Sequence, residues 1–542
     1  MMRIKIVFFN MEDSKKTIKK SVAKFFYGTL LSRFSGLLRD ILMASFFGSS
    51  SDIAAFMVSF RFANLFRRLF GEGSLQASFI PHFERLRVED RKKASRFYRD
   101  LFFSLFILLL VFVLFSEAGL ALTHFFSLEN DAMQIINLTM IMLPGLIFIC
   151  LYALSSSVLQ CHRKFFLPAV APIAFNLTWI LFVFLLRNKI PSYAVIVLSV
   201  AIVLGFFMQW VLVAFQSFRF GSEDLTLKGW LRPKLFSKEL KKLIPPIILS
   251  VIGIGAVQIN SAMDSIFAKI ADDAAPAYLW YAIRIEQLPL ALFGIAISSA
   301  LLPPLSRAIK TNMHHKINKF FNLALSRSMG LMVSVTMAIF VLGGVSINLL
   351  YGRGEFDQVS IINTLKCLWA YGFGLFPATY VLIFSTFFYA KKNYFYPMLG
   401  ALLSVVLNII LNSIFVFVFH LNAPSIAFAT SLSAGFNCLF LYFVLKKEKD
   451  LFDKHLWGYF IRALLCSLIS ALLVILVGVY LLQDPGQILL LFQKEYLFSR
   501  IFTYQIRDFA FLTGIFFVSL FTLSYIFKAD EILDNFKNLI KK

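Results

Sequence analysis

The sequence predicts an all-α integral membrane protein with about fourteen transmembrane helices. The 542 residues are 59% hydrophobic and only 15% charged, so the chain is more apolar than a soluble domain with one buried core. Apolar runs such as 101–115, 135–154, 194–215 and 463–482 approach or exceed the ~20 residues that cross a bilayer as a helix. Basic residues form short clusters between these runs, which indicates a membrane topology and not a nucleic-acid-binding module.

Apolar windows and the polar breaks between them place the predicted helices in order along the chain. The ranges are 24–47, 54–80, 100–125, 132–160, 166–186, 192–217, 243–270, 276–304, 322–350, 359–390, 395–419, 424–445, 459–482 and 508–527. Connections after the even-numbered helices are basic, and the opposite connections are neutral, acidic or mixed. By the positive-inside rule, we expect the basic connections and both termini to face the cytoplasm.

The first and second halves share spaced residues. Arg61, Asn64, Gly71 and Pro81 recur as Arg284, Gln287, Gly294 and Pro304, each at an offset of 223 residues, and Asp40 recurs as Asp264 at an offset of 224. Since an even number of helices separates the copies, we expect two six-helix lobes related by a pseudo-two-fold axis along the membrane normal, followed by two further helices. The predicted parts are a cytoplasmic segment 1–23, an N-terminal lobe 24–217, a basic linker 218–242, a C-terminal lobe 243–445, and two extra helices with a cytoplasmic tail 446–542.

Charged residues lie within the first two predicted helices and the eighth. In the first helix these are Arg33, Arg39 and Asp40, with Ser32 beside them. In the second helix, the spacing of one helical face joins Arg61, Asn64, Arg68, Glu72 and Gln76, with Arg67 further round. Exposing Arg33, Arg39, Arg61 and Arg284 to lipid would cost roughly 10 kcal/mol, so we expect them to face a water-filled interior cavity.

Two interpretations of these residues stay open. Pairing with Asp40 and Glu72 would make the arginines structural, and this fits Arg68 and Glu72 best, because they are four residues apart. However, two carboxylates cannot neutralise all the arginines, and an excess of guanidinium groups suits an anionic ligand such as a pyrophosphate. The candidate substrate-binding residues are Ser32, Arg33, Arg39, Asp40, Arg61, Arg67, Arg68, Glu72, Arg284 and Gln287.

A second polar group comprises Asp264, Asn408, Asn412 and Thr430 on the seventh, eleventh and twelfth predicted helices. One carboxylate with amide and hydroxyl oxygens could bind a monovalent cation such as sodium, or Asp264 alone could carry a proton. The sequence slightly favours the other interpretation, hydrogen bonding between helices, since Asn and Thr commonly provide it in membranes.

No motif indicates an enzyme or an ATP-driven pump. The sequence has no GxxxxGK loop followed by Ser or Thr and no HExxH, and its seven histidines form no metal-binding pattern. We therefore predict a transporter without a cofactor that uses an ion gradient, the membrane potential or the gradient of its substrate.

With these residues in view, the chain resembles the MviN/MurJ family, the lipid II flippases of bacterial peptidoglycan synthesis. The most specific matches are the segments 32–40, 64–73, 284–289 and 350–356. The resemblance implies a central cationic cavity, in which Arg39, Asp40 and Arg284 meet the pyrophosphate, and a groove near the last two helices for the polyprenyl tail. One departure is Ala54, where the family usually has an acid, whereas the nearest acid here is Asp52.

The function implied by the resemblance is translocation of lipid II from the cytoplasmic to the outer leaflet of the inner membrane by alternating access. The alternatives are a flippase for another lipid-linked oligosaccharide, or a multidrug exporter, although an exporter of cationic drugs should prefer an acidic cavity. The expected partners are lipid II and membrane lipids, without nucleic acid, and we expect a monomer.

Overall fold

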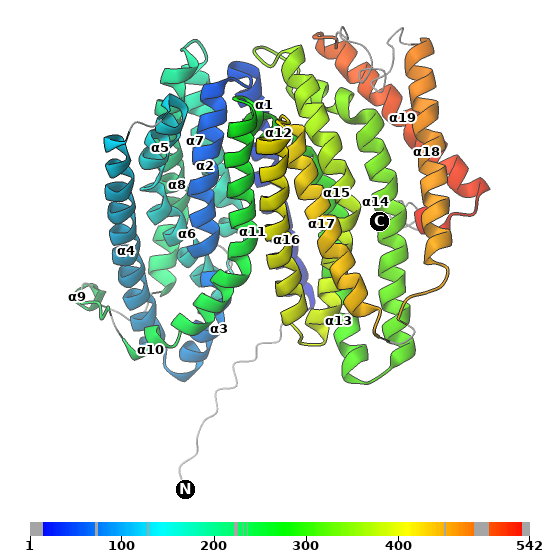
Figure 1. Cartoon of the computed structure of the whole chain (residues 1–542). Helices are drawn as coiled ribbons and strands as arrows, with labels where there is room; N and C mark the ends of the chain where they lie inside the picture. The colour runs from blue at the N-terminus through cyan, green and yellow to red at the C-terminus, as the bar shows by residue number, and fades with distance from the viewer. Residues whose placement is uncertain are drawn as a thin grey trace. The chain divides into compact units, whose positions relative to one another are not determined.

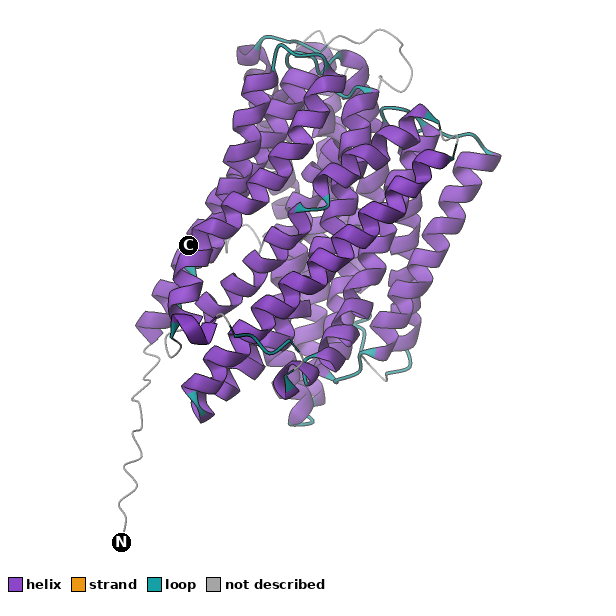
Figure 2. Cartoon of the chain, turned by 90° about the vertical axis from the view of Figure 1, so that its left-hand side faces the viewer, coloured by secondary structure: helices purple, strands orange, loops and turns teal. Residues whose placement is uncertain are grey.

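The described part of the computed structural model consists of helices and the loops that join them (Figure 2). The structure describes residues 15–70, 74–126, 129–221, 226–230, 232–235, 237–448, 451–481 and 498–533. Every regular element within these ranges is helical, which confirms the predicted all-α class. Two compact units divide the chain, and each is described by itself: unit 1 is Met1–Leu42 with Phe62–Gly255, and unit 2 is Met43–Arg61 with Ala256–Lys542.

Unit 1 contains most of the first half of the chain. The helices α1 (Lys15–Phe47), α2 (Ser51–Phe70) and α11 (Ile244–Ala271) cross the border between the units. The helices wholly within unit 1 are α3 (Ser74–Glu89), α4 (Arg91–Leu122), η1 (Thr123–Phe125), α5 (Asn130–Met142), α6 (Gly145–Cys161), α7 (Phe166–Leu186), α8 (Pro191–Gly221), α9 (Leu227–Trp230) and α10 (Lys238–Lys241). α8 packs against α5, α6 and α7, and α3 packs against α4 and α6.

Local chemistry sets where α4 begins. Asp90 is extended (φ −160°, ψ 112°), and its side chain accepts hydrogen bonds from the backbone N–H groups of Lys92 at 2.8 Å and Lys93 at 3.4 Å. These bonds satisfy two of the amides that a helix leaves free at its N-terminus. The helix therefore starts at Arg91 and places four basic residues in its first turns: Arg91, Lys92, Lys93 and Arg96.

Unit 2 contains the second half and the residues 43–61. Its remaining helices are α12 (Ala275–Pro289), η2 (Leu290–Ile295), α13 (Ala296–Lys310), α14 (His314–Tyr351), α15 (Gln358–Ala390), α16 (Phe395–Ser413), η3 (Ile414–Val418), α17 (Pro424–Leu445), α18 (Leu456–Leu481) and α19 (Phe502–Ile526). α15 packs against α12, α13, α14 and α17, while α14, α18 and α19 lie side by side (Figure 1). One apolar core includes Phe321, Phe384 and Phe516 from three of these helices.

The segment 43–61 is held to unit 2 by specific contacts. The Glu355 amide donates to the Ser45 carbonyl at 2.9 Å, and the Ser49 and Ser360 hydroxyls share a 2.7 Å hydrogen bond. These contacts lie within unit 2, to which residues 43–61 belong, and the predicted bounds of the two lobes stay a prediction.

Ten helices in the described residues are long and apolar enough to cross a membrane, and the count is up to eleven if the bent pair Asn130–Met142 and Gly145–Cys161 forms one span. The two members of that pair meet at 44°. α1 and α2 are not among the ten, and they carry the charged residues that the sequence places in a polar interior. The chain is thus a multi-pass membrane protein, and the count of fourteen stays a prediction.

Candidate functional site

Arg39 and Asp40 form a buried ion pair on α1 in unit 1. Arg39 Nε and Nη2 both donate to Asp40 Oδ1, at 3.0 Å and 2.7 Å, and the two residues are 6% and 2% exposed. Arg39 Nη1 donates to Asn176 Oδ1 of α7 at 3.1 Å. The guanidinium carbon also lies 4.3 Å from the centroid of the Trp179 ring, a cation–π contact. Asp40 and α7 therefore fix the Arg39 side chain in one orientation.

The neighbouring predicted residues on α1 differ in their surroundings. The Ser32 carbonyl accepts hydrogen bonds from Ser35 Oγ at 2.8 Å and Asn176 Nδ2 at 3.2 Å. Asn176 Nδ2 also donates to Ser35 Oγ at 2.8 Å. The stripe that joins Ser32, Ser35 and Arg39 thus faces α7, while Arg33 is exposed on another face of α1.

Arg61 and Arg284 lie near the same tryptophan in unit 2. Their guanidinium carbons are 5.7 Å and 4.3 Å from the centroid of the Trp280 ring. Arg61 Nη1 reaches the carbonyl and the hydroxyl of Ser261 on α11, at 3.4 Å and 3.5 Å. The other predicted residue of α12, Gln287, is exposed. The aromatic ring holds two guanidinium groups near one another, an arrangement that attracts an anion.

The structure brings together all four residues of the predicted cation group. The Asp264 carboxylate accepts from Asn412 Nδ2 at 2.8 Å, Thr430 Oγ1 at 3.0 Å and Asn260 Nδ2 at 3.2 Å. Asn412 Nδ2 also donates to Asn408 Oδ1 at 3.0 Å, and Asn408 Nδ2 approaches Thr430 Oγ1 at 3.4 Å. Asp264 is 4% exposed, and Asn408 and Asn412 are fully buried.

One oxygen of this group fits a cation site. Asn412 Oδ1 is buried and accepts no hydrogen bond within the described residues. Burying a carbonyl oxygen without a hydrogen-bond donor costs free energy, because the oxygen loses its hydrogen bonds to water. A small cation bound beside the carboxylate would offset this cost. In the same described ranges, no group of three His, Cys, Asp or Glu side chains is arranged for a metal ion. The oxygen donors therefore suit sodium or a proton better than a transition metal.

Three predicted residues have no described surroundings. The side chains of Arg67 and Arg68 on α2, and the whole of Glu72, lie outside the described residues. Their roles stay predictions.

Sequence reasoning missed Asn176, Trp179, Asn260 and Trp280, which contact the predicted residues. Asn176 lies within an apolar stretch, and only a tertiary contact distinguishes it from an ordinary lipid-facing or core position. Trp280 lies one helical turn before Arg284, which was a weak signal. Asn260 carried a weak signal, because it lies one helical turn before Asp264.

Comparison with known proteins gives one consistent family. The family model described as "Lipid II flippase MurJ" matches residues 43–494. A protein of Chlamydia muridarum named "Probable lipid II flippase MurJ" is 31% identical over 452 residues, which are 83% of this chain and 82% of the relative. A protein of the same name from Aquifex aeolicus is 29% identical over 428 residues, which are 77% of this chain and 81% of the relative.

Two kinds of solved structure share the fold. The structure titled "Lipid II flippase MurJ, inward closed conformation" has a TM-score of 0.75 and 24% identity, and the match covers 94% of this chain and 99% of that one. An inward-facing multidrug resistance transporter of the MATE family has a TM-score of 0.64 and 15% identity, and the match covers 79% and 99%.

Proposed function

This chain belongs to the MurJ family, a family of transporters and not of enzymes, and on that basis we propose that it moves lipid II from the cytoplasmic to the outer leaflet of a bacterial inner membrane. Lipid II is a disaccharide peptide joined through a pyrophosphate to a polyprenyl tail. The protein must therefore carry a large polar, anionic headgroup past the hydrocarbon while the tail remains in lipid.

The observation that carries the proposal is the placement of Arg61 and Arg284 beside Trp280 in a membrane protein. The hydrogen bonds and ring contact of Arg61 are to the neutral Ser261 and Trp280, and within the described residues only the more distant Asp264 carboxylate acts on its charge. A phosphate oxygen would supply a partner in direct contact.

Arg39 contributes in a different way. Asp40 already accepts two of its hydrogen bonds, so the pair is close to neutral and Arg39 offers few remaining N–H groups. We assign Arg39 and Asp40, with Ser32, the task of shaping one wall of the cationic cavity, and Arg284, Arg61, Arg33 and Gln287 the contacts with the headgroup. Arg67, Arg68 and Glu72 complete the predicted set.

The mechanism is alternating access between the lobes 24–217 and 243–445. The cavity first binds the pyrophosphate and sugar from the cytoplasmic side, and rocking of the two lobes then opens it outward. Moving one negative charge outward from a negative interior is favoured by about 2.3 kcal/mol per 100 mV, so the membrane potential favours the outward step. Both termini lie in the cytoplasm, and the protein works as a monomer.

We further propose that the Asp264 group couples transport to a monovalent cation. Asp264 supplies the charge, while Asn408, Asn412 and Thr430 supply neutral oxygens. Binding of sodium would offset the buried charge of Asp264 and favour one state of the cycle over the other. A proton on Asp264 is the alternative source of coupling.

Complementation tests the function. A strain depleted of its own lipid II flippase is given the wild-type chain, Arg284→Ala, Arg61→Ala or the exposed control Arg187→Ala, with equal amounts in the membrane confirmed by immunoblot. We expect the wild type and the control to restore growth, and Arg284→Ala and Arg61→Ala to restore little or none. Full rescue by Arg284→Ala and Arg61→Ala together would refute the role of the arginines, while failure of a well-expressed wild type would point to another lipid-linked oligosaccharide.

A further inference from the structure

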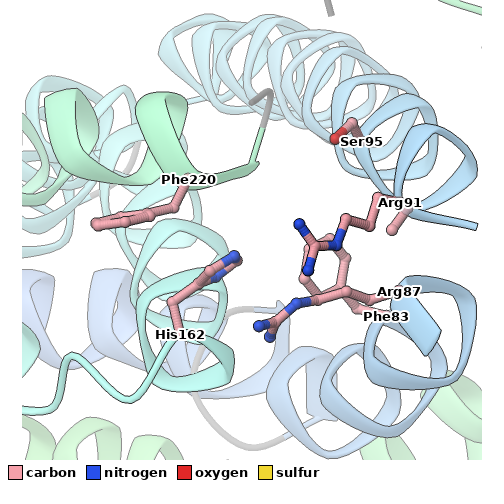
Figure 3. A pocket seen from close by; sticks show the side chains of 7 residues that line it. Phe83, Arg87, Arg91, Ser95, His162 and Phe220 are labelled. Atoms are coloured by element: carbon pink, nitrogen blue, oxygen red, sulfur yellow. The ribbon is translucent and has the colours of Figure 1, made fainter. Parts of the chain in front are cut away.

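A basic pocket lies in unit 1 where α3 and α6 end, α4 begins and α8 ends (Figure 3). Its volume is about 200 Å³, several times the ~30 Å³ of a water molecule in the liquid. The side chains that matter for its chemistry are Arg87, Arg91, Ser95, His162, Phe83 and Phe220. Three of the six carry basic nitrogens, and none is acidic.

Two walls of the pocket are held in place by hydrogen bonds. Arg87 Nη1 donates to Glu84 Oε1 at 3.1 Å and to the Cys161 carbonyl at 2.8 Å, which joins the end of α3 to the end of α6. The His162 ring donates from Nδ1 to the Val158 carbonyl at 2.9 Å and stacks on Phe220, with 5.2 Å between ring centroids. The site is therefore pre-formed, which lowers the entropy cost of binding a ligand.

The third wall supplies a cation that the protein leaves uncompensated. Arg91 is exposed and makes no hydrogen bond or ion pair within the described residues. It is the first residue of α4, and Ser95 follows one turn later with its side chain 5% exposed, so both face the pocket. Figure 3 shows the Arg91 guanidinium directed between the Arg87 side chain and the rings of His162 and Phe220.

Nearby acids do not cancel this charge. Glu84 is engaged by Arg87, and Asp90 accepts from the first amides of α4. A further cation lies close by, since Lys164 Nζ is 5.8 Å from the centroid of the Phe220 ring. The pocket thus has an excess of positive charge together with directed N–H and O–H donors.

We propose that this pocket binds a phosphate group, with Arg91 as the main contact and Arg87 and Ser95 as further donors. Guanidinium groups match phosphate oxygens in geometry and charge. The phosphate would come from the headgroup of an anionic phospholipid, since basic pockets at the ends of transmembrane helices recognise such headgroups, or from a soluble phosphate. This inference goes beyond the proposed function and does not depend on the arginines of α1, α2 and α12.

The test compares three probes on the full chain purified in a neutral detergent. Isothermal titration calorimetry measures binding of dioctanoyl phosphatidate, inorganic phosphate and, as a neutral comparison, dioctanoyl phosphatidylcholine. The variant is Arg91→Gln, and Arg96→Gln is its matched control, because Arg96 is an exposed arginine of the same helix outside the pocket lining. Neither side chain makes a described hydrogen bond, so both variants should fold, as thermal unfolding would verify.

We expect phosphatidate to bind the wild type and Arg96→Gln equally, and Arg91→Gln about tenfold more weakly or not at all. Arg91→Lys should recover part of the affinity, because it restores the charge without the planar fork. If inorganic phosphate binds with the same dependence on Arg91, a soluble phosphate is a sufficient ligand; if only phosphatidate does, the ligand is a lipid. Three results would overturn the proposal. They are an equal loss of affinity in Arg91→Gln and Arg96→Gln, binding of phosphatidylcholine as tight as that of phosphatidate, and no binding of phosphatidate or phosphate.

Discussion

Asn412 of α16 donates a 2.8 Å hydrogen bond to the carboxylate of Asp264 on α11, while its own carbonyl oxygen is buried without a donor in the described part of the chain. The N–H groups of the Asn412 amide donate to Asp264 and to Asn408, so only its carbonyl oxygen is left without a partner among the described residues. A monovalent cation bound beside the carboxylate would give this oxygen a partner.

Sodium should stabilise the wild-type protein through this cluster. A ligand that binds the folded state raises the free energy of unfolding by RT ln(1 + [L]/Kd), about 2.7 kcal/mol at one hundred times Kd. Thermal unfolding in sodium chloride and in choline chloride of equal ionic strength measures the effect. Asp264→Asn should abolish the difference between the salts, whereas Asn437→Leu, a buried control on α17, should keep it. If sodium raises the melting temperature of Asp264→Asn as much as that of the wild type, the site does not bind sodium.

Removal of Arg39 should destabilise unit 1. Arg39→Gln removes the buried ion pair with Asp40, and loss of one member of such a pair costs about 3–5 kcal/mol in proteins. Asn176→Leu removes one hydrogen-bond partner of Arg39 and should cost about 1–3 kcal/mol. Arg33→Gln, on an exposed face of the same helix, should lie within about 0.5 kcal/mol of the wild type. Denaturant unfolding in detergent measures the free energy of unfolding of each variant. If Arg39→Gln has the same free energy of unfolding as the wild type, the ion pair is not structural.

Gly354 should tolerate no side chain. It has φ +56°, and a Cβ atom there would overlap the Ser45 carbonyl oxygen at 2.0 Å. Left-handed backbone costs a residue with a Cβ about 1–2 kcal/mol, and the overlap also breaks the close approach of 350–356 to α1. Gly354→Ala should therefore lower the melting temperature, while Gly435→Ala on α17, where a Cβ meets nothing within 4 Å, should leave it unchanged or raise it. Equal melting temperatures for the two variants would contradict the prediction.

Acidification should destabilise unit 1 at His82, where α3 meets α10. His82 Nε2 and Glu239 Oε2 are 3.0 Å apart at the polar end of unit 1. Burial lowers the pKa of His82 below its ordinary 6.5, and the charge of Arg85 lowers it further, while Glu239 opposes both. The hydrogen bond from Lys242 likewise lowers the pKa of Glu239.

Both shifts have the same sign for stability. Because His82 binds a proton at lower pH when folded than when unfolded, its contribution is complete above pH 6.5 and is lost as pH falls through the folded pKa. Glu239 adds a similar loss below its ordinary 4.5. Melting temperatures of the wild type and His82→Gln should therefore converge between pH 7.5 and 5.5, while the exposed control His314→Gln follows the wild type throughout. If the difference in melting temperature between the wild type and His82→Gln grows as the pH falls, the pH dependence has the opposite sign and the account is refuted.

The sequence by itself determined the class of the protein. Long apolar runs, few charges and basic clusters between the runs predicted a helical membrane protein, because backbone amides in lipid must be satisfied within each helix. The helical class and the family are confirmed. The same reasoning found Asp264, Asn408, Asn412 and Thr430 as one group, since polar side chains inside apolar spans are too costly to face lipid.

Only the tertiary structure decided what each polar residue contacts. The contacts of Arg39 with Asn176 and Trp179, the Trp280 ring shared by Arg61 and Arg284, and the basic pocket around Arg91 join residues from helices far apart in sequence. Charge and periodicity give the face of a helix on which a residue lies. The partner of that residue depends on which other helix packs against this face and on how the two helices are aligned along their axes. Asn176 therefore carried no signal in the sequence, although the structure places it against Arg39.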